Sequence, residues 1–357
     1  MRVIISAGGT GGHIYPALAI VSEIKKHNPD STFLYIGTLE RMEKDIVPKY
    51  GIDYKGLDVK AFSTKKPFSS FKEYKKAYKE CQTIVKDFKP DVVIGVGGYI
   101  TVPVILAAHK LGIKTFIHEQ NSVPGKANAL LSKYANKIGV SFKGSLKYFP
   151  PSKTFITGNP CGDEALNQLA VDKSTLGLSD DKKLVLIVMG SLGSSKVNEY
   201  LIKILPDFKS KDYEILLVSG EDNYDMFKNL DVPSNVKIAS YIEGLPRIMK
   251  RTDLMVSRAG ASALSEIISL ELPAILIPSP YVSNNHQYKN AIDLISNDAA
   301  ILLEEKDLVD DSLIKTVDEV INDDDKLLKL KSNMKELKVE NSSHKIYKII
   351  EELVGKE

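Results

Sequence analysis

Short apolar runs alternate along this chain with stretches in which apolar residues recur every three or four positions. The first pattern predicts buried strands, and the second predicts amphipathic helices. Strands are predicted at residues 3–5, 33–37, 91–95, 114–117 and 154–157, and again at 184–188, 213–218, 235–239, 253–256 and 273–278. Helical periodicity follows most of them, which is typical of βαβ units and a parallel sheet. The sequence therefore predicts an α/β fold.

The two halves of the chain open in the same way. The run at 3–5 leads into Ser6-Ala7-Gly8-Gly9-Thr10-Gly11-Gly12-His13, and the run at 184–188 leads into residues 189–195. A predicted helix follows each turn. This order forms an anion site, because glycine lets the backbone approach a ligand and the first amides of a helix point at it. We expect two similar α/β halves with a ligand cleft between them.

Further helices are predicted at 39–49, 102–111, 307–320, 323–338 and 342–354. A turn at Gly158-Asn159-Pro160 closes the first half, and we place a linker within 158–163. Asp323-Asp324-Asp325 formally matches the acidic motif of metal-dependent sugar transferases. Aspartate is also a preferred N-cap residue, and we favour the interpretation that these residues cap a surface helix.

Composition excludes several classes of protein. The 357 residues are 43% apolar and 26% charged, and a net charge of +2 is too small for a general nucleic-acid binder. Cys81 and Cys161 form no CxxC pair, so neither a disulfide framework nor a zinc site is expected. The first seven residues indicate a strand rather than a signal peptide. No apolar stretch reaches the roughly 18 residues of a membrane span. We expect a protein of the cytosol or of the cytosolic membrane face.

Polar residues follow two of the predicted strands. His118 and Asn121 come after the run at 114–117, and ligands bind beyond the carboxyl ends of parallel strands. Capping of a loop is the alternative role for such residues. In the second half, a small-residue loop at 257–266 opens a helix. Glu266 there either reaches a ligand's hydroxyl groups or complements the helix dipole.

A basic stretch lies between Lys60 and Glu80. It has seven lysines and two glutamates, with aromatic residues interleaved at Phe62, Phe68, Phe71, Tyr74 and Tyr78. The spacing of the last three places them on one face of a helix. Either this face packs on the core while the lysines keep the surface soluble, or the stretch docks onto anionic lipid headgroups.

Several glycine signatures are absent. Ile14 stands where the dinucleotide-binding fingerprint requires its third glycine, and neither a P-loop nor a nucleophile elbow occurs. Small-residue loops with polar groups at strand ends suit a diphosphate held by backbone amides and helix dipoles without a metal. Transfer of a sugar from a nucleotide is the natural reaction, because the leaving diphosphate needs preorganised donors.

An ordered set of motifs spans essentially the whole chain and resembles the MurG-type transferase family. The set comprises residues 8–13, Arg41-Met42-Glu43, Gly97-Gly98-Tyr99, His118-Glu119-Gln120-Asn121, Gly158-Asn159-Pro160, residues 257–261 and His286-Gln287-Tyr288. The resemblance implies a GT-B fold of two Rossmann-like domains. It places acceptor binding and membrane association in residues 1–160 and binding of UDP-N-acetylglucosamine (UDP-GlcNAc) in residues 161–341. The helix at 342–357 would pack back on the first domain.

The same resemblance implies an inverting, metal-independent transfer that needs no cofactor. N-acetylglucosamine (GlcNAc) would move through a β-1,4 link to the N-acetylmuramic acid (MurNAc) of undecaprenyl-diphospho-MurNAc-pentapeptide, in peptidoglycan synthesis. The expected partners are these two substrates, an anionic membrane surface and other wall-synthesis proteins, with no nucleic acid. The expected location is the cytoplasmic side of the cell membrane.

The resemblance also assigns the site residues. His13 would be the general base, since imidazole titrates near neutrality, with ordering of the loop as its alternative role. Thr10, Gly11, Gly12 and Asn121 would complete the site from the first domain. In the second domain, Ser191 would meet the diphosphate, the backbone of Ile242 the uracil, and Gln287 the sugar or phosphate. Glu266 would accept from the ribose hydroxyls, within a run that wraps the nucleoside and consists of Ala261, Ser262, Ala263, Leu264, Ser265 and Glu266.

The chain departs from the family pattern near the donor phosphate. Gly162 stands where the family commonly has an arginine, and Met189 and Ser195 replace a glycine and an arginine of the second glycine loop. We hypothesise that Lys196 supplies the missing positive charge. The alternatives to the MurG-type reaction are a diacylglycerol glycosyltransferase, a UDP-GlcNAc 2-epimerase and a non-catalytic UDP-sugar-binding protein.

Overall fold

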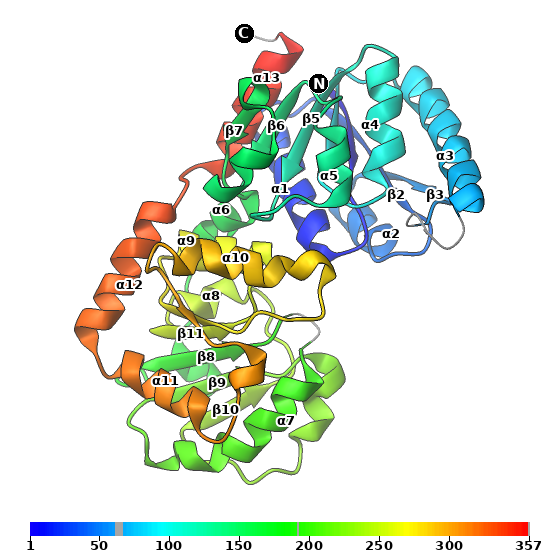
Figure 1. Cartoon of the computed structure of the whole chain (residues 1–357). Coiled ribbons are helices and arrows are strands. Elements are labelled where there is room, and N and C mark those ends of the chain that lie inside the picture. Colours follow the sequence, from blue (N-terminus) through cyan, green and yellow to red (C-terminus); the bar gives the residue numbers. More distant parts are fainter. Residues whose placement is uncertain (61–66, 191–192, 356–357) are drawn as a thin grey trace. The chain divides into compact units, whose positions relative to one another are not determined.

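The computed structural model describes residues 1–60, 67–190 and 193–355. The chain divides into two compact units (Figure 1). Unit 1 comprises Met1–Cys161 and Val339–Glu357, and unit 2 comprises Gly162–Lys338. Each unit is an α/β domain built on a parallel sheet, so the α/β fold predicted from the apolar pattern is confirmed.

Unit 1 contains a seven-stranded sheet in the order β3-β2-β1-β4-β5-β6-β7. Its strands are β1 (Arg2–Ser6), β2 (Thr32–Thr38), β3 (Asp53–Leu57), β4 (Val92–Gly95), β5 (Lys114–Glu119), β6 (Lys137–Val140) and β7 (Thr154–Ile156). The helices between them are α1 (Gly11–His27), α2 (Glu43–Ile46), α3 (Pro67–Phe88), α4 (Thr101–Lys110) and α5 (Lys126–Leu131).

The sheet of unit 1 is buried on both faces, as parallel sheets are. Alternate residues of β1 enter different cores: Val3 and Ile5 pack with α1, whereas Ile4 packs with α3 and α4. Because side chains alternate along a strand, a continuous apolar run is what this double burial requires. The runs that predicted the strands therefore reflect the two cores directly.

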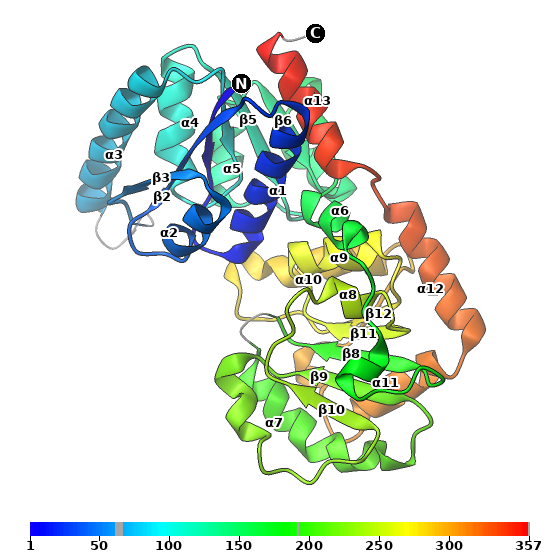
Figure 2. The same cartoon turned by 180° about the vertical axis from the view of Figure 1, so that it is seen from behind.

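The C-terminal helix α13 (Ser342–Val354) belongs to unit 1 and lies beside α1 (Figure 2). Its residues Ile346, Tyr347 and Ile350 are buried in the same core as Val3 and Ile5. The last helix of the chain thus packs on the first helix and shares a core with the first strand.

Unit 2 contains a six-stranded parallel sheet in the order β10-β9-β8-β11-β12-β13. Its strands are β8 (Leu184–Val188), β9 (Glu214–Val218), β10 (Val236–Ala239), β11 (Leu254–Ser257), β12 (Ala274–Leu276) and β13 (Ile301–Leu302). Its helices are α7 (Ser195–Ile204), α8 (Pro246–Met249), α9 (Ala261–Ser269), α10 (His286–Ile295), α11 (Ser312–Ile321) and α12 (Asp324–Leu337), and α6 (Pro160–Asn167) spans the boundary between the units. Side chains of α7 and α11 pack on one face of the sheet.

Some helix boundaries differ from the predictions. The helix expected at 39–49 consists of the short α2 followed by a 3₁₀ turn at Val47–Tyr50 that contains Pro48, which has no amide hydrogen to donate. The helix expected at 307–320 begins only at Ser312. Asp323 caps α12 by accepting a hydrogen bond from the Lys326 amide, which confirms the capping interpretation of the acidic triplet.

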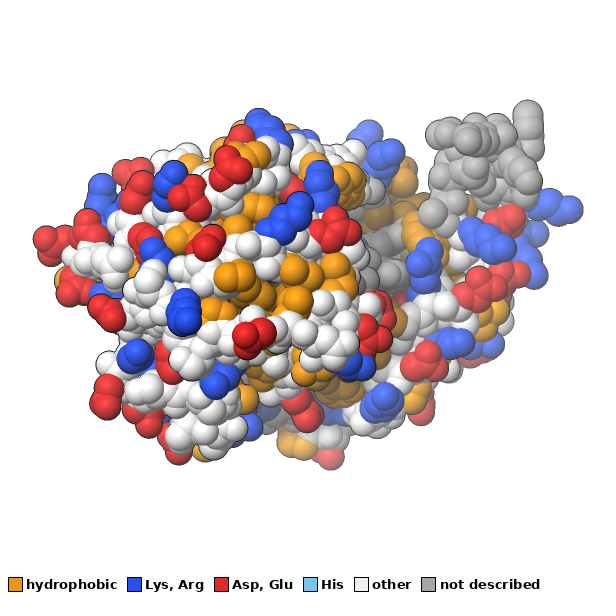
Figure 3. All heavy atoms as spheres, turned by 90° about the horizontal axis from the view of Figure 1, so that it is seen from below, with side chains coloured by type: hydrophobic (Ala, Val, Ile, Leu, Met, Phe, Trp, Pro, Cys, Tyr) orange, Lys and Arg blue, Asp and Glu red, His pale blue; other side chains and the backbone are white. Residues whose placement is uncertain are grey.

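On the face that Figure 3 shows, acidic and basic side chains are interspersed and are not segregated by charge. This agrees with the small net charge of +2. Among the described residues, no helix is both long enough and apolar enough to cross a membrane.

Candidate active site

The loops of unit 1 meet where the strand order of its sheet reverses. β1 lies between β2 and β4, so the chain leaves β1 toward one side of the sheet and later returns on the other. Such a switch point opens a crevice at the carboxyl ends of its two strands. The glycine-rich loop after β1 and the Gly97-Gly98 loop after β4 both occupy this edge.

The backbones of these two glycine loops are in direct contact. The Gly8 amide donates to the Gly97 carbonyl at 3.3 Å. Gly98 has φ +88°, and a Cβ atom there would lie 2.5 Å from the Gly8 oxygen. Gly97 has φ +105°, and its Cβ would lie 2.6 Å from Cδ2 of His13. Glycine is therefore required at both positions by conformation and by space.

A buried carboxylate fixes the first loop from the other side. Glu43 of α2 is fully buried and accepts hydrogen bonds from Oγ1 of Thr38 at 2.7 Å and from the Thr38 amide at 3.1 Å. Its second oxygen accepts from the Gly9 amide at 3.3 Å. The Arg41-Met42-Glu43 motif thus acts through Glu43 as a positioning residue, a role that the sequence alone did not reveal.

His13 lies in the first turn of α1 with its ring against Gly97. Its Nδ1 atom is 3.2 Å from the Gly8 carbonyl oxygen and 3.4 Å from Oγ1 of Thr10. A carbonyl can only accept, so Nδ1 carries the proton and Nε2 keeps its lone pair. Burial lowers the pKa of His13, against the raising effects of the Glu119 charge, the Gly8 hydrogen bond and the Glu43 charge. A neutral imidazole with a free Nε2 lone pair is the form that a general base needs.

His118 has a structural role in the fold. It is fully buried, its Nε2 contacts the Gly158 carbonyl at 2.9 Å, and its Nδ1 contacts Nε2 of Gln120 at 2.9 Å. Burial lowers the pKa of His118 to about 4, so the ring is neutral at pH 7. Both nitrogens are engaged within the fold, as the loop-capping alternative requires.

Asn121 is held by the neighbouring carboxylate. Oε1 of Glu119 accepts from the amide and from Nδ2 of Asn121, both at 3.0 Å. The other oxygen, Oε2, accepts from the Gly125 amide at 3.0 Å and from Nδ2 of Asn128 at 2.9 Å. The loop after β5 is therefore rigidly organised around Glu119.

Unit 2 repeats the switch-point arrangement, with β8 between β9 and β11. The second glycine loop follows β8, and residues 258–260 follow β11. Ser191 lies outside the described residues. Gly193 has φ +71°, and a Cβ atom there would lie 2.1 Å from the Ser219 oxygen. Ser195 donates to Oδ1 of Asn223 at 2.7 Å, and Met189 belongs to the apolar core.

A buried ion pair supports this second loop. Arg258 is 6% exposed and donates through one nitrogen to Oε2 of Glu305 at 2.7 Å and to Oγ of Ser194 at 2.8 Å. Lys196 lies 3.5 Å from the other Glu305 oxygen and 3.3 Å from the Tyr281 hydroxyl. The hydrogen bond to Tyr281 and the carboxylate of Glu305 raise the pKa of Lys196, which keeps it cationic. Sequence reasoning missed the contribution of Arg258, although the residue stands within a quoted motif.

The helix α9 begins at Ala261 after an extended Gly260, so the amides of its first turn have no partner within the helix. Ala261, Ser262 and Ala263 keep exposed surface at this end. Leu264 and Ser265 are buried, and Ser265 donates to the Ala261 carbonyl at 2.7 Å. These last two residues can therefore meet a ligand only through their backbone.

The Glu266 side chain is partly buried. Burial and the charge of Glu164 raise the pKa of Glu266 to about 7. Gln287, in the first turn of α10, accepts from the Ser279 amide at 2.8 Å through Oε1, which orients its amide group. Ile242 lies half-buried in the irregular segment after β10. Of these residues, Glu266 has a perturbed pKa, and carboxyl groups with perturbed pKa values gather at functional sites.

Gly162 is explained by packing. A Cβ atom there would lie 2.1 Å from Oγ of Ser269 and 3.0 Å from the backbone oxygen of Ser265. The helices α6 and α9 therefore approach too closely for any side chain at position 162.

Comparison with known proteins covers both units. The family model described as the glycosyltransferase family 28 N-terminal domain matches residues 3–140, and the corresponding C-terminal domain matches residues 184–353. These two matches define a glycosyltransferase of family 28.

Similar proteins narrow the class. A Bacillus cereus protein named UDP-N-acetylglucosamine--N-acetylmuramyl-(pentapeptide) pyrophosphoryl-undecaprenol N-acetylglucosamine transferase 1 is 44% identical over 100% of both chains. A solved MurG structure from Acinetobacter baumannii has a TM-score of 0.80 at 25% identity and covers 98% of this chain and 99% of that chain. The chain belongs to the MurG family, and the GT-B fold expected from the resemblance is confirmed.

A UDP-GlcNAc 2-epimerase from Neisseria meningitidis, solved with UDP-GlcNAc bound, has a TM-score of 0.69 at 17% identity. It covers 99% of this chain and 100% of that chain. At this identity, the likeness shows a shared fold alone.

Replacement of Gly98 tests the interlock of the loops. We expect Gly98→Ala to destabilise the protein more than Gly112→Ala, by about 1–3 kcal/mol. Both glycines have positive φ, +88° and +73°, but only a Cβ at position 98 meets the Gly8 oxygen. Chemical denaturation measures the difference. Equal losses for the two variants would show that the loops are not in close contact.

The raised pKa of Glu266 predicts a pH dependence of stability. The folded state binds a proton more tightly than the unfolded state, so ionisation of Glu266 costs stability progressively from pH 4.5 to about 7. We expect Glu266→Gln to stabilise the ligand-free protein by about 1–3 kcal/mol at pH 8 and much less at pH 5. The exposed Glu199→Gln variant is the control. A gain that does not change with pH would contradict the burial of this carboxyl group.

Proposed function

We propose that this chain transfers GlcNAc from UDP-GlcNAc to the 4-hydroxyl of MurNAc in undecaprenyl-diphospho-MurNAc-pentapeptide. The observation that carries the proposal is the neutral His13, whose proton is fixed on Nδ1 by the Gly8 carbonyl at the switch point of unit 1. The name of the Bacillus cereus relative describes a transfer between the same donor and acceptor.

In this reaction Nε2 of His13 accepts the proton of the acceptor hydroxyl. The hydroxyl oxygen attacks the anomeric carbon of GlcNAc opposite the diphosphate, and the bond between this carbon and the UDP oxygen breaks. UDP leaves with the electron pair, and inversion at the anomeric carbon gives a β link. Thr10, Gly11, Gly12 and Asn121 would hold the acceptor near His13. Their loops are already held by Glu43 and Glu119, so little reorganisation is needed.

Unit 2 supplies the donor site in this proposal. Amides at the start of α9 bind the nucleoside side of UDP-GlcNAc, and a carboxyl oxygen of Glu266 accepts from the ribose hydroxyls. The backbone of Ile242 meets uracil, Gln287 meets the sugar or phosphate, and the loop that contains Ser191 meets the diphosphate. A helix N-terminus is a suitable anion site because its first amides lack partners.

In this proposal Lys196 takes the place of the family's arginine, and the buried Arg258 supports the loop before it. Lys196 is 64% exposed at the start of α7 and can reach the diphosphate. Arg258 holds the loop before α7 through its hydrogen bond to Oγ of Ser194. Glu305 holds both cations, at 2.7 Å and 3.5 Å. Its negative charge keeps them in place before the diphosphate binds.

The helix α3 is the proposed membrane-docking element. Lys72, Lys75, Lys76 and Lys79 are exposed, and Phe71 is 67% exposed. Tyr74 and Tyr78 instead pack against the core, so the aromatic face divides between the two roles considered from sequence. Phe62 and Lys65 lie outside the described residues. Exposed lysines beside an exposed aromatic ring suit an anionic lipid surface.

Incubation with labelled UDP-GlcNAc, with and without the muramoyl-pentapeptide lipid and in the presence of EDTA, tests the transfer. We expect label in the lipid only when acceptor is present. His13→Gln should lower kcat by about 10²–10⁴-fold while UDP affinity is kept, and the exposed His109→Gln should leave both unchanged. Because the pKa of His13 is lowered, activity of the unsubstituted enzyme should persist below the ordinary histidine pKa of about 6.5.

Each contrary result has a distinct meaning. Consumption of the donor without acceptor would indicate an epimerase. Donor binding without any turnover would indicate a UDP-sugar-binding protein. Full activity of the His13→Gln variant would remove His13 as the base.

Charge reversal on α3 tests membrane docking. We expect simultaneous replacement of Lys75, Lys76 and Lys79 by Glu to weaken binding to phosphatidylglycerol vesicles at least about a hundredfold, at roughly 1 kcal/mol per lysine. Turnover of a soluble acceptor analogue should not change. Reversal of the exposed Lys329, Lys331 and Lys335 on α12 is the matched control. Equal losses of vesicle binding for both triple variants would contradict a docking role for α3.

A further inference from the structure

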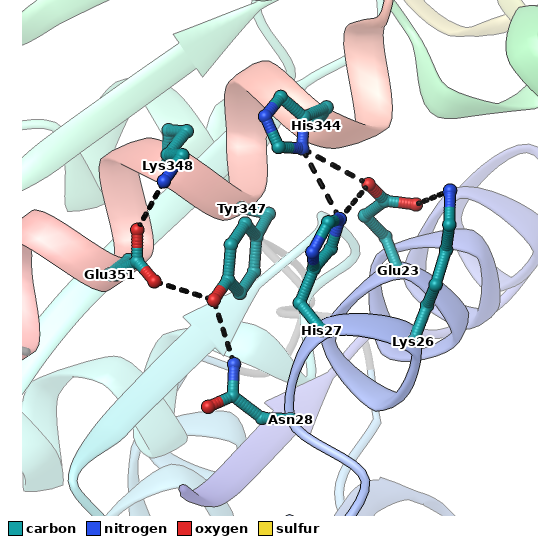
Figure 4. Close-up of polar contacts among 8 residues, drawn as sticks. All are labelled: Glu23, Lys26, His27, Asn28, His344, Tyr347, Lys348 and Glu351. Atoms are coloured by element: carbon teal, nitrogen blue, oxygen red, sulfur yellow. Dashed lines mark hydrogen bonds and ion pairs between the residues drawn. The ribbon is translucent and has the colours of Figure 1, made fainter.

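Three side chains with metal-ligating atoms meet where α1 and α13 pack together (Figure 4). Glu23 and His27 come from α1, and His344 comes from α13. Nε2 of His27 is 2.9 Å from Oε1 of Glu23, and Nδ1 of His344 is 3.4 Å from the same oxygen. The two ring nitrogens are 3.3 Å apart. One oxygen and two nitrogens therefore form a compact triangle.

The fold brings these groups together from opposite ends of the sequence. Glu23 and His27 are four residues apart and so share one face of α1. His344 stands in the first turn of α13, two residues before the buried Ile346. Glu23 and His27 lie 10 and 14 residues along α1 from His13, or roughly 15 and 21 Å at the helical rise per residue, so the cluster is separate from the crevice.

The triangle has the dimensions of one face of a tetrahedral metal site. Zinc binds imidazole nitrogen and carboxylate oxygen at about 2.0–2.2 Å, so neighbouring ligands of a tetrahedral ion lie roughly 3.3 Å apart. The observed separations are 2.9, 3.3 and 3.4 Å. Only small side-chain adjustments would seat the ion. Two imidazoles and one carboxylate are a ligand set that suits zinc.

Neighbouring residues hold the ligands in position. The ring of Tyr347 stacks on His27 with centroids 4.5 Å apart and planes inclined by 18°. The Tyr347 hydroxyl accepts from Nδ2 of Asn28 at 2.8 Å and donates to Oε1 of Glu351 at 2.6 Å. Outer contacts of this kind orient metal ligands. Lys26 lies 3.7 Å from the second oxygen of Glu23, but its side chain is 72% exposed and can turn away.

The ligands also leave room for solvent. The side chains of Glu23, His27 and His344 are 13%, 31% and 43% exposed. A water molecule can therefore complete the coordination sphere.

We propose that Glu23, His27 and His344 bind one zinc ion, which clasps the C-terminal helix α13 to α1. The ion would join the first helix of the chain to its last and so stabilise the packing of α13 within unit 1. This site is independent of sugar transfer, and its ligands take no part in the proposed reaction.

Calorimetric titration of the full-length, untagged protein with Zn²⁺ tests the site. We expect one equivalent to bind, with His344→Gln, His27→Gln and Glu23→Gln each weakening it at least tenfold. His109→Gln is the matched control, because His109 is exposed on α4 of the same unit and should leave affinity unchanged. Circular dichroism checks that each variant is folded. Zinc binding that is equally strong in the His27→Gln and His344→Gln variants, or no binding at all, would overturn the proposal.

Hydrogen exchange tests the clasp. Zn²⁺ should slow exchange of the amides of residues 342–354 at least several-fold in the unsubstituted protein and in His109→Gln, but not in His344→Gln. EDTA should reverse the effect. Zinc binding that leaves exchange in α13 unchanged would refute the clasp.

Discussion

The hydrogen bond between Nδ1 of His13 and the Gly8 carbonyl is the interaction on which the proposed chemistry depends. It decides which ring nitrogen holds the proton, and therefore which one can receive another. The bond exists because the loop after β1 turns back over the start of α1. That loop keeps its shape because Gly97 and Gly98 fit against it without side chains and because Glu43 binds the Gly9 amide.

The two units use one architecture for different chemistry. Each places a glycine loop and a second loop at the point where the strand order of a parallel sheet reverses. In unit 1 the site presents the neutral imidazole of His13. In unit 2 it presents the first turns of α7 and α9, which the buried ion pair of Arg258 and Glu305 supports. The first arrangement suits removal of a proton, and the second suits binding of a diphosphate.

The alternating apolar runs predicted most strands, because strands buried on both faces must be continuously apolar. The strands β3, β6 and β13 escaped prediction: β3 lies at a sheet edge and is polar and half-exposed, and β6 and β13 have only four and two residues. Motif order predicted the family. The roles of Glu43, Arg258 and Gly162 could not be predicted, because each depends on a contact with a residue distant in sequence. For His118, position at a strand end left a functional role and loop capping both open, and burial with two partners within the fold indicates the structural role.

Nitrogen-15 NMR of the imidazole of His13 tests the central claim most directly. At pH 7 and without substrate, the account predicts a neutral ring with the proton on Nδ1 and an unprotonated Nε2. It also predicts that this state persists below the ordinary histidine pKa of about 6.5. A ring that is protonated on Nε2, or on both nitrogens at pH 7, would contradict the role of the Gly8 carbonyl and remove His13 as the base.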